Sequence, residues 1–474
     1  MGKKIAIVGS GVAGSSVALY LGQLGLDVTV FEKESSFVSG PPFCHLHAGG
    51  NLYREIDDNQ CISLLKQSID FLRFYPYVID YRPTVIAIPQ VDSGNVKDLL
   101  PRLELLKNEY EKLIELDSKN RVLGDSCDYY KLYDKEDMEN LKAKDIVEKP
   151  QTLDEWMIPV AQNVDLEKIK FPLIIVQEYG LNLFRLSAGV TLALDKIKNI
   201  KLNMKTKVTN ITKTKRWEVS YLKDGLESSE EFDYLINATG FRTGEIDDMV
   251  GVKTHRMVEF KSAYITKFKS YEKTLFPEII FHGVRGTPQG MGQFTPYPNG
   301  YFQLHGMTKD ITLFEDGLVY SDAYSSQPKL SKSFLKKIDD SWSADEVESR
   351  TNKAIKHIAN FIPKFQQAKV GSKPLYGAQQ IVGDDPELRV AEVSFCIDSY
   401  ARCEIVKVSS VMDMIDEIVK QLVRLKFLDD GVYKSRDLSY LDSLNRKDIE
   451  SMAKKIAKSR DYPESLACLN NKKE

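Results

Sequence analysis

The residues with the clearest chemical pattern lie within the first thirty-two positions of the chain. Gly9, Gly11 and Gly14 stand in the order G-x-G-x-x-G, and seventeen residues separate Gly14 from Glu32. The first glycine of such a pattern allows a tight turn, the second lets the backbone approach a diphosphate, and the third lets a helix pack closely on a strand. The acid accepts hydrogen bonds from ribose hydroxyls. This spacing predicts a site for a dinucleotide.

Two strands and a helix must position these residues. Residues 3–8 are a short apolar run with β-branched side chains, which predicts a buried parallel strand. Val12 and Ala13 open a helical pattern, so the diphosphate would lie at the positive end of a helix. Residues 27–32 form a second strand that ends in the acid, and Lys33 follows it. Because an acid ends this strand, a 2′-phosphate is disfavoured, and FAD and NAD remain as ligands.

A separate nicotinamide site would need a second turn of this kind, and the sequence contains no further G-x-G-x-x-G. The nearest cluster of glycines, at residues 286–300, includes three prolines and predicts a loop. One dinucleotide is therefore expected, and reoxidation by oxygen, a quinone or another carrier is expected in place of NAD.

Two arginines in the second half of the chain are candidates for binding a substrate carboxylate. Arg285 precedes the glycine-rich segment, and Arg242 directly follows the sequence A-T-G-F. A guanidinium group suits this task because its two N–H groups match the two oxygens of a carboxylate. We expect Arg285 to bind the carboxylate, with Arg242 as the alternative.

A polar face is predicted on the strand at residues 300–307. Side chains alternate between the faces of a strand, so Tyr301, Gln303 and His305 share one face, opposite Phe302 and Leu304. His305 is a candidate proton acceptor if this face lines a cleft. The alternative is an exposed sheet face.

Composition excludes several classes of function. The chain has 474 residues, 42% of them hydrophobic, and 65 Lys and Arg against 68 Asp and Glu give a formal net charge of -3. This balance lacks the excess of positive charge that is typical of nucleic-acid-binding proteins. No apolar run approaches the ~18–20 residues that span a bilayer. The start of the chain does not resemble a signal peptide. The six cysteines include no C-x-x-C pair, so a cytoplasmic protein without structural metal is expected, with a peripheral location at the inner membrane as a variant.

The dinucleotide pattern is followed, in order, by T-K-V-T-N-I around Val208 and by I-N-A-T-G-F at residues 236–241. This succession resembles FAD-dependent oxidoreductases of the D-amino-acid oxidase type, which include glycine oxidase, 2-hydroxyglutarate oxidase and malate:quinone oxidoreductase. The resemblance implies FAD as the cofactor. It also implies that the backbone at Val208 contacts the adenine and that Ala238, Thr239 and Gly240 lie near the ribityl or diphosphate portion.

The resemblance also assigns a role to the loop-like segment at residues 39–53. In the family, this stretch passes along the flavin ring, and the sequence H-A-G-G is similar to a segment of 2-hydroxyglutarate oxidases. His47, Ala48 and Gly49 are therefore candidates for flavin contact, and His47 is a candidate covalent tether or acid–base group. The alternative is that His45 and His47 only form hydrogen bonds with the loop backbone.

The chain departs from the family before its last helix. A glycine-rich turn is common there, whereas this sequence has Tyr400, Ala401, Arg402 and Cys403. Arg402 could compensate by placing a cation near the flavin N1–C2 carbonyl, where negative charge develops on reduction. The alternative is a surface salt bridge.

The expected fold is α/β, with a Rossmann-like FAD-binding domain of the glutathione-reductase type and an inserted β-rich substrate domain. Residues 429–474 are expected to form a peripheral helical appendage. The predicted ranges are 1–90, 171–245 and 365–428 for the FAD-binding domain, and 91–170 and 246–364 for the substrate domain.

The expected activity is oxidation of a small organic acid at its α-carbon by hydride transfer to flavin. The H-A-G resemblance favours a 2-hydroxy acid of the malate or 2-hydroxyglutarate type, and an amino acid or secondary amine is the alternative. Two readings of another class remain, a flavin-binding protein that modifies a macromolecule and a catalytically idle flavoprotein. His47, Arg285 and His305 are the predicted catalytic residues.

Overall fold

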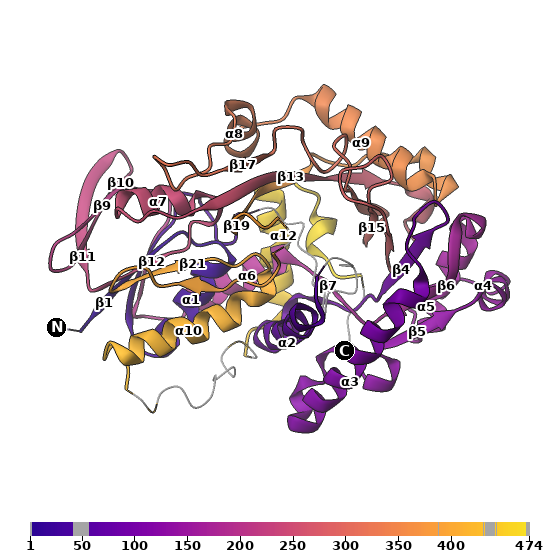
Figure 1. Ribbon diagram of the computed structural model, residues 1–474, viewed down its shortest axis with the longest axis horizontal. Helices are drawn as coiled ribbons and strands as arrows, with labels where there is room; N and C mark the ends of the chain where they lie inside the picture. Colours follow the sequence, from indigo (N-terminus) through magenta and orange to yellow (C-terminus); the bar gives the residue numbers. More distant parts are fainter. Residues whose placement is uncertain are drawn as a thin grey trace.

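The structure is a computed structural model, and it describes residues 2–40, 56–386, 388–429, 431, 441 and 443–470. A parallel sheet and a larger mixed sheet form its two layers, with helices packed around them (Figure 1). The predicted α/β class, with a parallel nucleotide-binding sheet and a second β-rich layer, is confirmed.

The parallel sheet contains both strands that were predicted to flank the glycine turn. β1 pairs in parallel with β2 on one side and with β12 on the other, and only the edge strand β20 is antiparallel. Val8 therefore stands beside Phe31 and Asn237, so the strands meet at the same edge of the sheet. In spatial order the strands are β20 (Val393–Ser394), β21 (Tyr400–Cys403), β12 (Tyr234–Asn237), β1 (Lys4–Val8), β2 (Asp27–Phe31) and β8 (Ile200–Asn203).

Successive side chains of β1 point to opposite faces of the parallel sheet, and each face packs in its own hydrophobic layer. Ile5 and Ile7 pack in the cluster formed with helices, while Ala6 and Val8 face a three-stranded meander. The helices of the first layer are α1 (Val12–Gln23), α2 (Asp58–Phe74), α6 (Leu183–Leu194), α10 (Val411–Arg424) and α12 (Arg446–Ser459). The second layer consists of β9 (Thr206–Lys213), β10 (Trp217–Lys223), β11 (Leu226–Phe232) and α7 (Thr243–Met249).

The second sheet is organised around its longest strand, β13, which pairs with four other strands. β18 (Lys369–Val370) and β19 (Leu375–Val382) add to β13 beside the main path. The order along the main path is β17 (Leu318–Tyr320), β13 (Arg256–Lys267), β16 (Tyr301–Gly306), β15 (Gly292–Tyr297), β14 (Glu278–Phe281), β4 (Thr84–Pro89), β6 (Ile169–Val176) and β5 (Tyr130–Tyr133). A separate short pair joins β3 (Ile79–Asp80) to β7 (Gly180–Leu181).

The second sheet has an apolar face, here called the outer face, which packs against α5 and α9. Phe294, Phe302 and Leu304 pack there with side chains of α9 and α5, which leaves the polar side chains of β15 and β16 on the inner face. The remaining helices are α3 (Leu100–Leu116), α4 (Lys135–Lys142), α5 (Leu153–Asn163), α8 (Lys332–Asp339) and α9 (Ala344–Ala359).

The placement of three strands and of one loop differs from the sequence-based expectation. β4, most of β6 and β19 belong to the second sheet, although they fall inside the ranges predicted for the FAD-binding domain. An apolar strand does not reveal which sheet it joins, because its partners are distant in sequence. The glycine cluster predicted as a loop contains β15, where pairing with β14 and β16 on both sides imposes an extended backbone despite Pro296.

The C-terminal residues are not peripheral. Residues 446–459 form α12, in which Ile449, Ala453 and Ala457 are fully buried in the main hydrophobic cluster, and α12 packs on α6. The sparse apolar stripe of this segment suggested a surface helix. A narrow stripe is nevertheless enough to bury one face of a helix.

We expect Ile449→Ala to lower the free energy of unfolding by about 2–5 kcal/mol, because Ile449 is 0% exposed and its removal leaves a cavity. Urea denaturation followed by tryptophan fluorescence measures this change. Lys455→Ala on the exposed face of α12 is the matched control and should be nearly neutral. A similar, small effect for both variants would restore the peripheral assignment.

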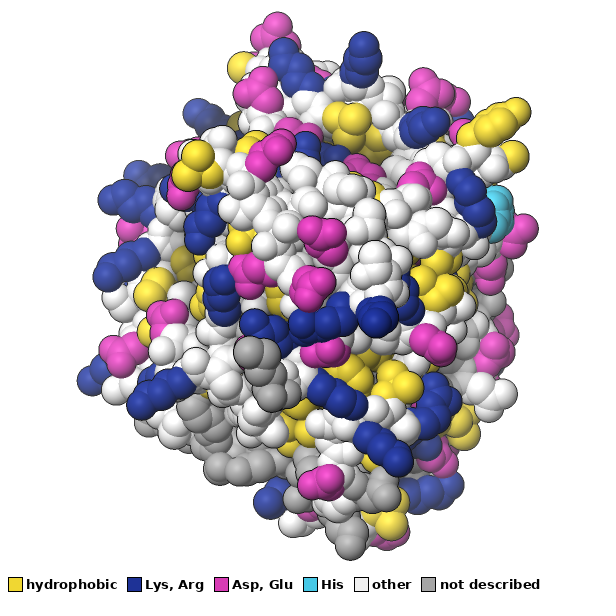
Figure 2. Space-filling view, turned by 90° about the vertical axis from the view of Figure 1, so that its left-hand side faces the viewer, with side chains coloured by type: hydrophobic (Ala, Val, Ile, Leu, Met, Phe, Trp, Pro, Cys, Tyr) yellow, Lys and Arg dark blue, Asp and Glu magenta, His cyan; other side chains and the backbone are white. Residues whose placement is uncertain are grey.

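The surface shows no dominant charge on the face displayed in Figure 2. Basic and acidic side chains are interspersed there, and apolar side chains are scattered. Within the described residues, no helix is long and apolar enough to cross a membrane.

Candidate functional site

The three glycines of the N-terminal turn occupy distinct environments. Gly9 has a φ of +91°, a region that favours glycine. A Cβ at Gly14 would lie 1.9 Å from the carbonyl oxygen of Gly9, so helix and strand approach closely there. A Cβ at Gly11 would meet no atom within 4 Å. Gly11 therefore borders open space at the N-terminus of α1, as a diphosphate requires.

Glu32 is buried at the end of β2 and is held by the same turn. Its Oε2 accepts hydrogen bonds from the backbone N–H and the hydroxyl of Ser10, at 2.6 and 2.8 Å. Its Oε1 accepts from the backbone N–H of Glu34 at 2.8 Å. A carboxylate offers about four acceptor positions, so one remains for a ribose hydroxyl. The turn, the open space and the oriented acid together fit FAD.

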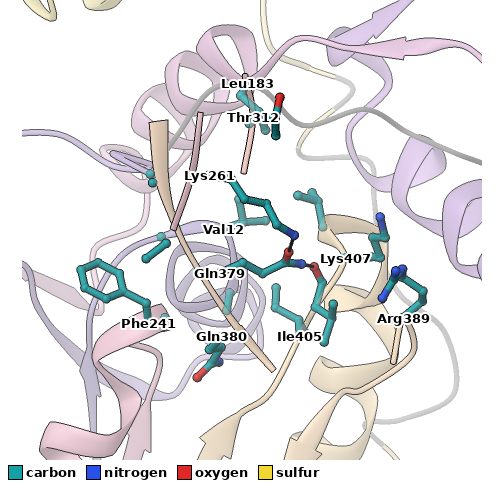
Figure 3. A pocket seen from close by; sticks show the side chains of 18 of the residues that line it. Val12, Leu183, Phe241, Lys261, Thr312, Gln379, Gln380, Arg389, Ile405 and Lys407 are labelled. Atoms are coloured by element: carbon teal, nitrogen blue, oxygen red, sulfur yellow. Dashed lines mark hydrogen bonds between the residues drawn. The ribbon is translucent and has the colours of Figure 1, made fainter. Parts of the chain in front are cut away.

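A cavity of about 450 Å³ begins at this turn and extends to the inner face of the second sheet. Figure 3 shows side chains from several distant segments pointing into it, including Val12 from α1, Phe241 after β12, and Gln379 from β19. Of the residues predicted from the sequence, the cavity lining includes Gly11, Val12, Ala13, Ala238, Gly240, Arg285 and His305.

Lys261 of β13 lines this cavity, and its side chain is 18% exposed. Its Nζ lies 2.6 Å from Oε2 of Glu259 and donates a hydrogen bond to Oε1 of Gln379 at 3.0 Å (Figure 3). The amide of Gln379 in turn donates to the carbonyl oxygen of Val406 at 2.9 Å. Burial lowers the pKa of Lys261 to about 8, although Glu259 opposes this shift. Lys261 can therefore exchange a proton near neutral pH.

Arg285 also lines the cavity, and it forms an ion pair with Oε1 of Glu259. Its side chain is 36% exposed, whereas that of Glu259 is 9% exposed. Glu259 therefore lies between the two cations Lys261 and Arg285 and balances one of their charges. These three side chains carry one net positive charge when Lys261 is protonated, and Arg389 and Lys407 also line the cavity, which suits an anionic ligand.

The polar face predicted on β16 is confirmed. Phe302 and Leu304 pack in the outer core, while Gln303 and His305 are buried on the inner face, and His305 lines the cavity. The alternative of an exposed face is wrong for both polar residues. Gln293 of β15 stands opposite His305 in the register and lines the same wall.

The expectation for Arg402 needs correction. Arg402 lies in the interior of β21 and does not belong to the cavity lining. Its guanidinium contacts Asp247 at 3.0 Å and donates to Thr254 at 2.6 Å, and it is also paired with Glu404. These buried partners hold its charge away from the cavity. Two other cations line the cavity, Arg389 and Lys407, and Lys407 follows β21 (Figure 3).

Of the other predicted residues, the structure describes Val208, Lys33 and Thr239 but not the histidine loop. Val208 is buried two residues after Thr206, whose N–H donates to the carbonyl oxygen of Glu32 at 2.7 Å, so β9 runs close to the acid. Lys33 is paired with Glu34 and Asp339 at the surface. Roles for these residues and for Thr239 stay predictions. His47, Ala48 and Gly49 lie outside the described residues.

Arg242 pairs with Glu245 and Asp339 and is absent from the cavity lining, which leaves Arg285 as the better placed of the two arginines. Sequence reasoning missed Lys261 and Gln379. A signal for Lys261 was present, because Glu259 and Lys261 are two residues apart on one strand and therefore place opposite charges on the same face. Among the residues that the structure describes, no group of three or more His, Cys, Asp or Glu could hold a metal ion.

Residues 4–123 match the family model described as "DAO: FAD dependent oxidoreductase". A comparison with curated protein sequences found no match.

Three solved structures share the fold at low sequence identity. An L-proline dehydrogenase from P. horikoshii is 15% identical, with a TM-score of 0.56 over 93% of this chain and 98% of that one. A glycine oxidase from Geobacillus kaustophilus is 12% identical, with a TM-score of 0.54 over 89% and 95%. A glycerol-3-phosphate dehydrogenase from Bacillus halodurans, in complex with FAD, is 11% identical, with a TM-score of 0.59 over 98% and 73%.

Proposed function

We propose that this chain, an FAD-dependent oxidoreductase of the D-amino-acid oxidase type, oxidises a small amino or imino acid at its α-carbon. The observation that carries the proposal is one cavity that joins the dinucleotide turn at Gly11 to the cation Arg285 and the buried amine of Lys261. An amino acid presents a carboxylate and an amine, and this wall offers one group suited to each.

The names of the structurally similar proteins support an amine over a 2-hydroxy acid. Two of the three act on proline and glycine according to their names, and the third acts on glycerol 3-phosphate. The amine alternative from the sequence is therefore better supported than the 2-hydroxy acid that the H-A-G resemblance favoured. Oxygen or a quinone as the final electron acceptor stays a prediction.

Each residue of the wall has a task that its chemistry fits. The residues of the dinucleotide turn would hold FAD, which would supply a hydride acceptor for the α-carbon. Arg285 would bind the substrate carboxylate in competition with Glu259. Neutral Lys261 would accept a proton from the substrate ammonium group, because only the free amine has a lone pair to form the C=N bond of the imine product. His305 and Gln293 border the space beside them.

The proposal is tested by anaerobic bleaching of the flavin absorbance with a substrate panel. The panel contains small amino acids, N-alkyl amino acids and proline, together with malate, 2-hydroxyglutarate and glycerol 3-phosphate. We expect bleaching by at least one amine and none by the hydroxy compounds. Bleaching by malate or 2-hydroxyglutarate alone would contradict the proposal and support a 2-hydroxy acid as the substrate. Bleaching by glycerol 3-phosphate alone would exclude both amino acids and 2-hydroxy acids.

Arg285→Ala is expected to lower kcat/KM at least about tenfold, with the loss mainly in KM and with Arg285→Lys intermediate. A pair between charged groups in a water-poor site is worth about 2–5 kcal/mol when one partner is removed, and each 1.4 kcal/mol is tenfold. The 36% exposure of Arg285 places the effect at the lower end of this range. FAD content should not change, and Arg350→Ala is a control at a part-buried arginine outside the cavity. Unchanged kinetics in Arg285→Ala would assign the carboxylate to Lys407 or Arg389.

A further inference from the structure

The C-terminal segment reaches the loop that follows β2 through one arginine. Arg460, directly after α12, donates hydrogen bonds to the carbonyl oxygens of Val38 at 3.0 Å and Phe37 at 2.8 Å. It also donates to the hydroxyl of Ser36 at 2.9 Å and lies 3.3 Å from that of Ser187. Four groups, three of them in consecutive residues, thus converge on one guanidinium.

These contacts involve a charged group without a carboxylate partner among the residues that the structure describes. Arg460 takes part in backbone and hydroxyl contacts but in no ion pair with a described Asp or Glu. Burial lowers its pKa to about 10, against the attraction of Tyr462, Glu34 and Glu32. Burying a cation in this way is costly unless its N–H groups are satisfied. The carbonyl oxygens of residues 37 and 38 are therefore held firmly in one direction.

The loop held by Arg460 is connected to the dinucleotide turn. Val38 has a φ of +51°, a strained conformation for a β-branched residue. Its N–H donates to the carbonyl oxygen of Ser10 at 2.9 Å, and Ser10 donates both its N–H and its hydroxyl to Glu32. Val38 also lines the cavity. Arg460 therefore stabilises a strained residue that contacts the turn and borders the cofactor space.

The same segment is also fixed to the second sheet. The hydroxyl of Tyr462 donates to the carbonyl oxygen of Pro374 at 2.9 Å, and Asn299 donates to the hydroxyl of Ser465 at 2.9 Å. Asn470 donates to the carbonyl oxygen of Pro296 in β15 at 2.8 Å, and it also donates to both carboxylate oxygens of Asp80 in the separate strand β3 at 2.9 and 2.8 Å. α12 and the residues after it lie centrally between the layers in Figure 1. Arg460 is thus anchored independently of the loop that it contacts.

We propose that Arg460 is a positioning residue for FAD, which holds residues 36–38 against the dinucleotide turn and so completes the cofactor site from the C-terminal end of the chain. The proposal concerns cofactor binding alone and does not depend on the substrate.

The test measures FAD affinity of the apoprotein, from quenching of flavin fluorescence, together with the melting temperature with and without FAD. Arg460→Met keeps an apolar stem but removes every donor, together with the guanidinium that lies 5.9 Å from the centre of the Phe184 ring. We expect its dissociation constant for FAD to rise at least tenfold. Arg460→Lys should be intermediate, because one ammonium group does not reproduce the fork that contacts Ser36, Phe37 and Val38 together.

Lys458→Met is the matched control, since it removes the same charge from an exposed position of α12. A positioning role predicts that FAD raises the melting temperature less in Arg460→Met than in Lys458→Met. An equal FAD-induced rise in both variants, with dissociation constants within threefold of the parent, would overturn the proposal. If Arg460→Met does not fold, Arg460→Lys decides: a threefold or greater rise in its dissociation constant supports the role, and an unchanged value rejects it.

Discussion

Gly11→Val is expected to yield a folded protein that does not bind FAD. Gly11 has a φ of -60°, which any residue adopts, and a Cβ there would meet no protein atom within 4 Å. The substitution should therefore leave the melting temperature of the apoprotein within a few degrees of the parent. A valine side chain would instead occupy the space that the diphosphate requires at the N-terminus of α1. We expect at least about a hundredfold loss of FAD affinity, equal to about 2.7 kcal/mol, by flavin fluorescence titration.

The neighbouring glycine provides the contrast. A Cβ at Gly14 would lie 1.9 Å from the carbonyl oxygen of Gly9, so Gly14→Val must separate α1 from β1 and should destabilise the apoprotein itself. A stable Gly11→Val protein with full flavin content would show that the diphosphate does not approach this turn. The pair of variants thus separates a glycine needed for the cofactor from one needed for packing.

The difference between these glycines also shows what the sequence can predict. The turn, α1 and the flanking strands are encoded within about thirty consecutive residues, so their spacing alone predicts the local geometry. Alternation likewise predicted that His305 and Gln303 share a face, because a strand has a fixed period of two. Neither pattern states what the face contacts. What the face contacts depends on the pairing of β16 with β13 and β15, and this pairing cannot be read from the sequence of β16 alone.

The wrong expectation for Arg402 and the failure to find Lys261 have the same cause, which is that strand pairing is not apparent in the sequence. Arg402 was assigned to the cofactor from its place before the last helix, yet it points into a buried network with Asp247 and Glu404 that only the pairing of β12 with β21 creates. The importance of Lys261 depends on Glu259 two residues earlier and on Gln379 from β19, more than a hundred residues away. Side chains that act together here come from strands whose partners are not apparent in the sequence.

Lys261→Met is expected to lower turnover by about a hundredfold to ten-thousandfold while FAD remains bound, since general base catalysis contributes rate factors of this size. Methionine approximates the length of the stem but does not accept a proton. Glu259 keeps Arg285 as a partner in this variant, so an unpaired buried carboxylate is not left behind. The dinucleotide turn lies on other elements, and flavin content should match the parent. Stopped-flow bleaching of the flavin with the substrate identified from the panel measures the change.

The dependence on pH makes this prediction specific to proton transfer. Burial lowers the pKa of Lys261 to about 8, and only its neutral form accepts a proton. The second-order rate constant of flavin reduction, measured at low substrate, reports the pKa of the free enzyme and should therefore rise as the pH rises through about 8, and Lys261→Met should lose this rise. Lys267→Met is the matched control, because Lys267 lies on the same strand, is also paired with a glutamate, at 2.8 Å, and is absent from the cavity lining. Equal rates and equal pH profiles in the two variants would reject Lys261 as the proton acceptor and leave that task to His305.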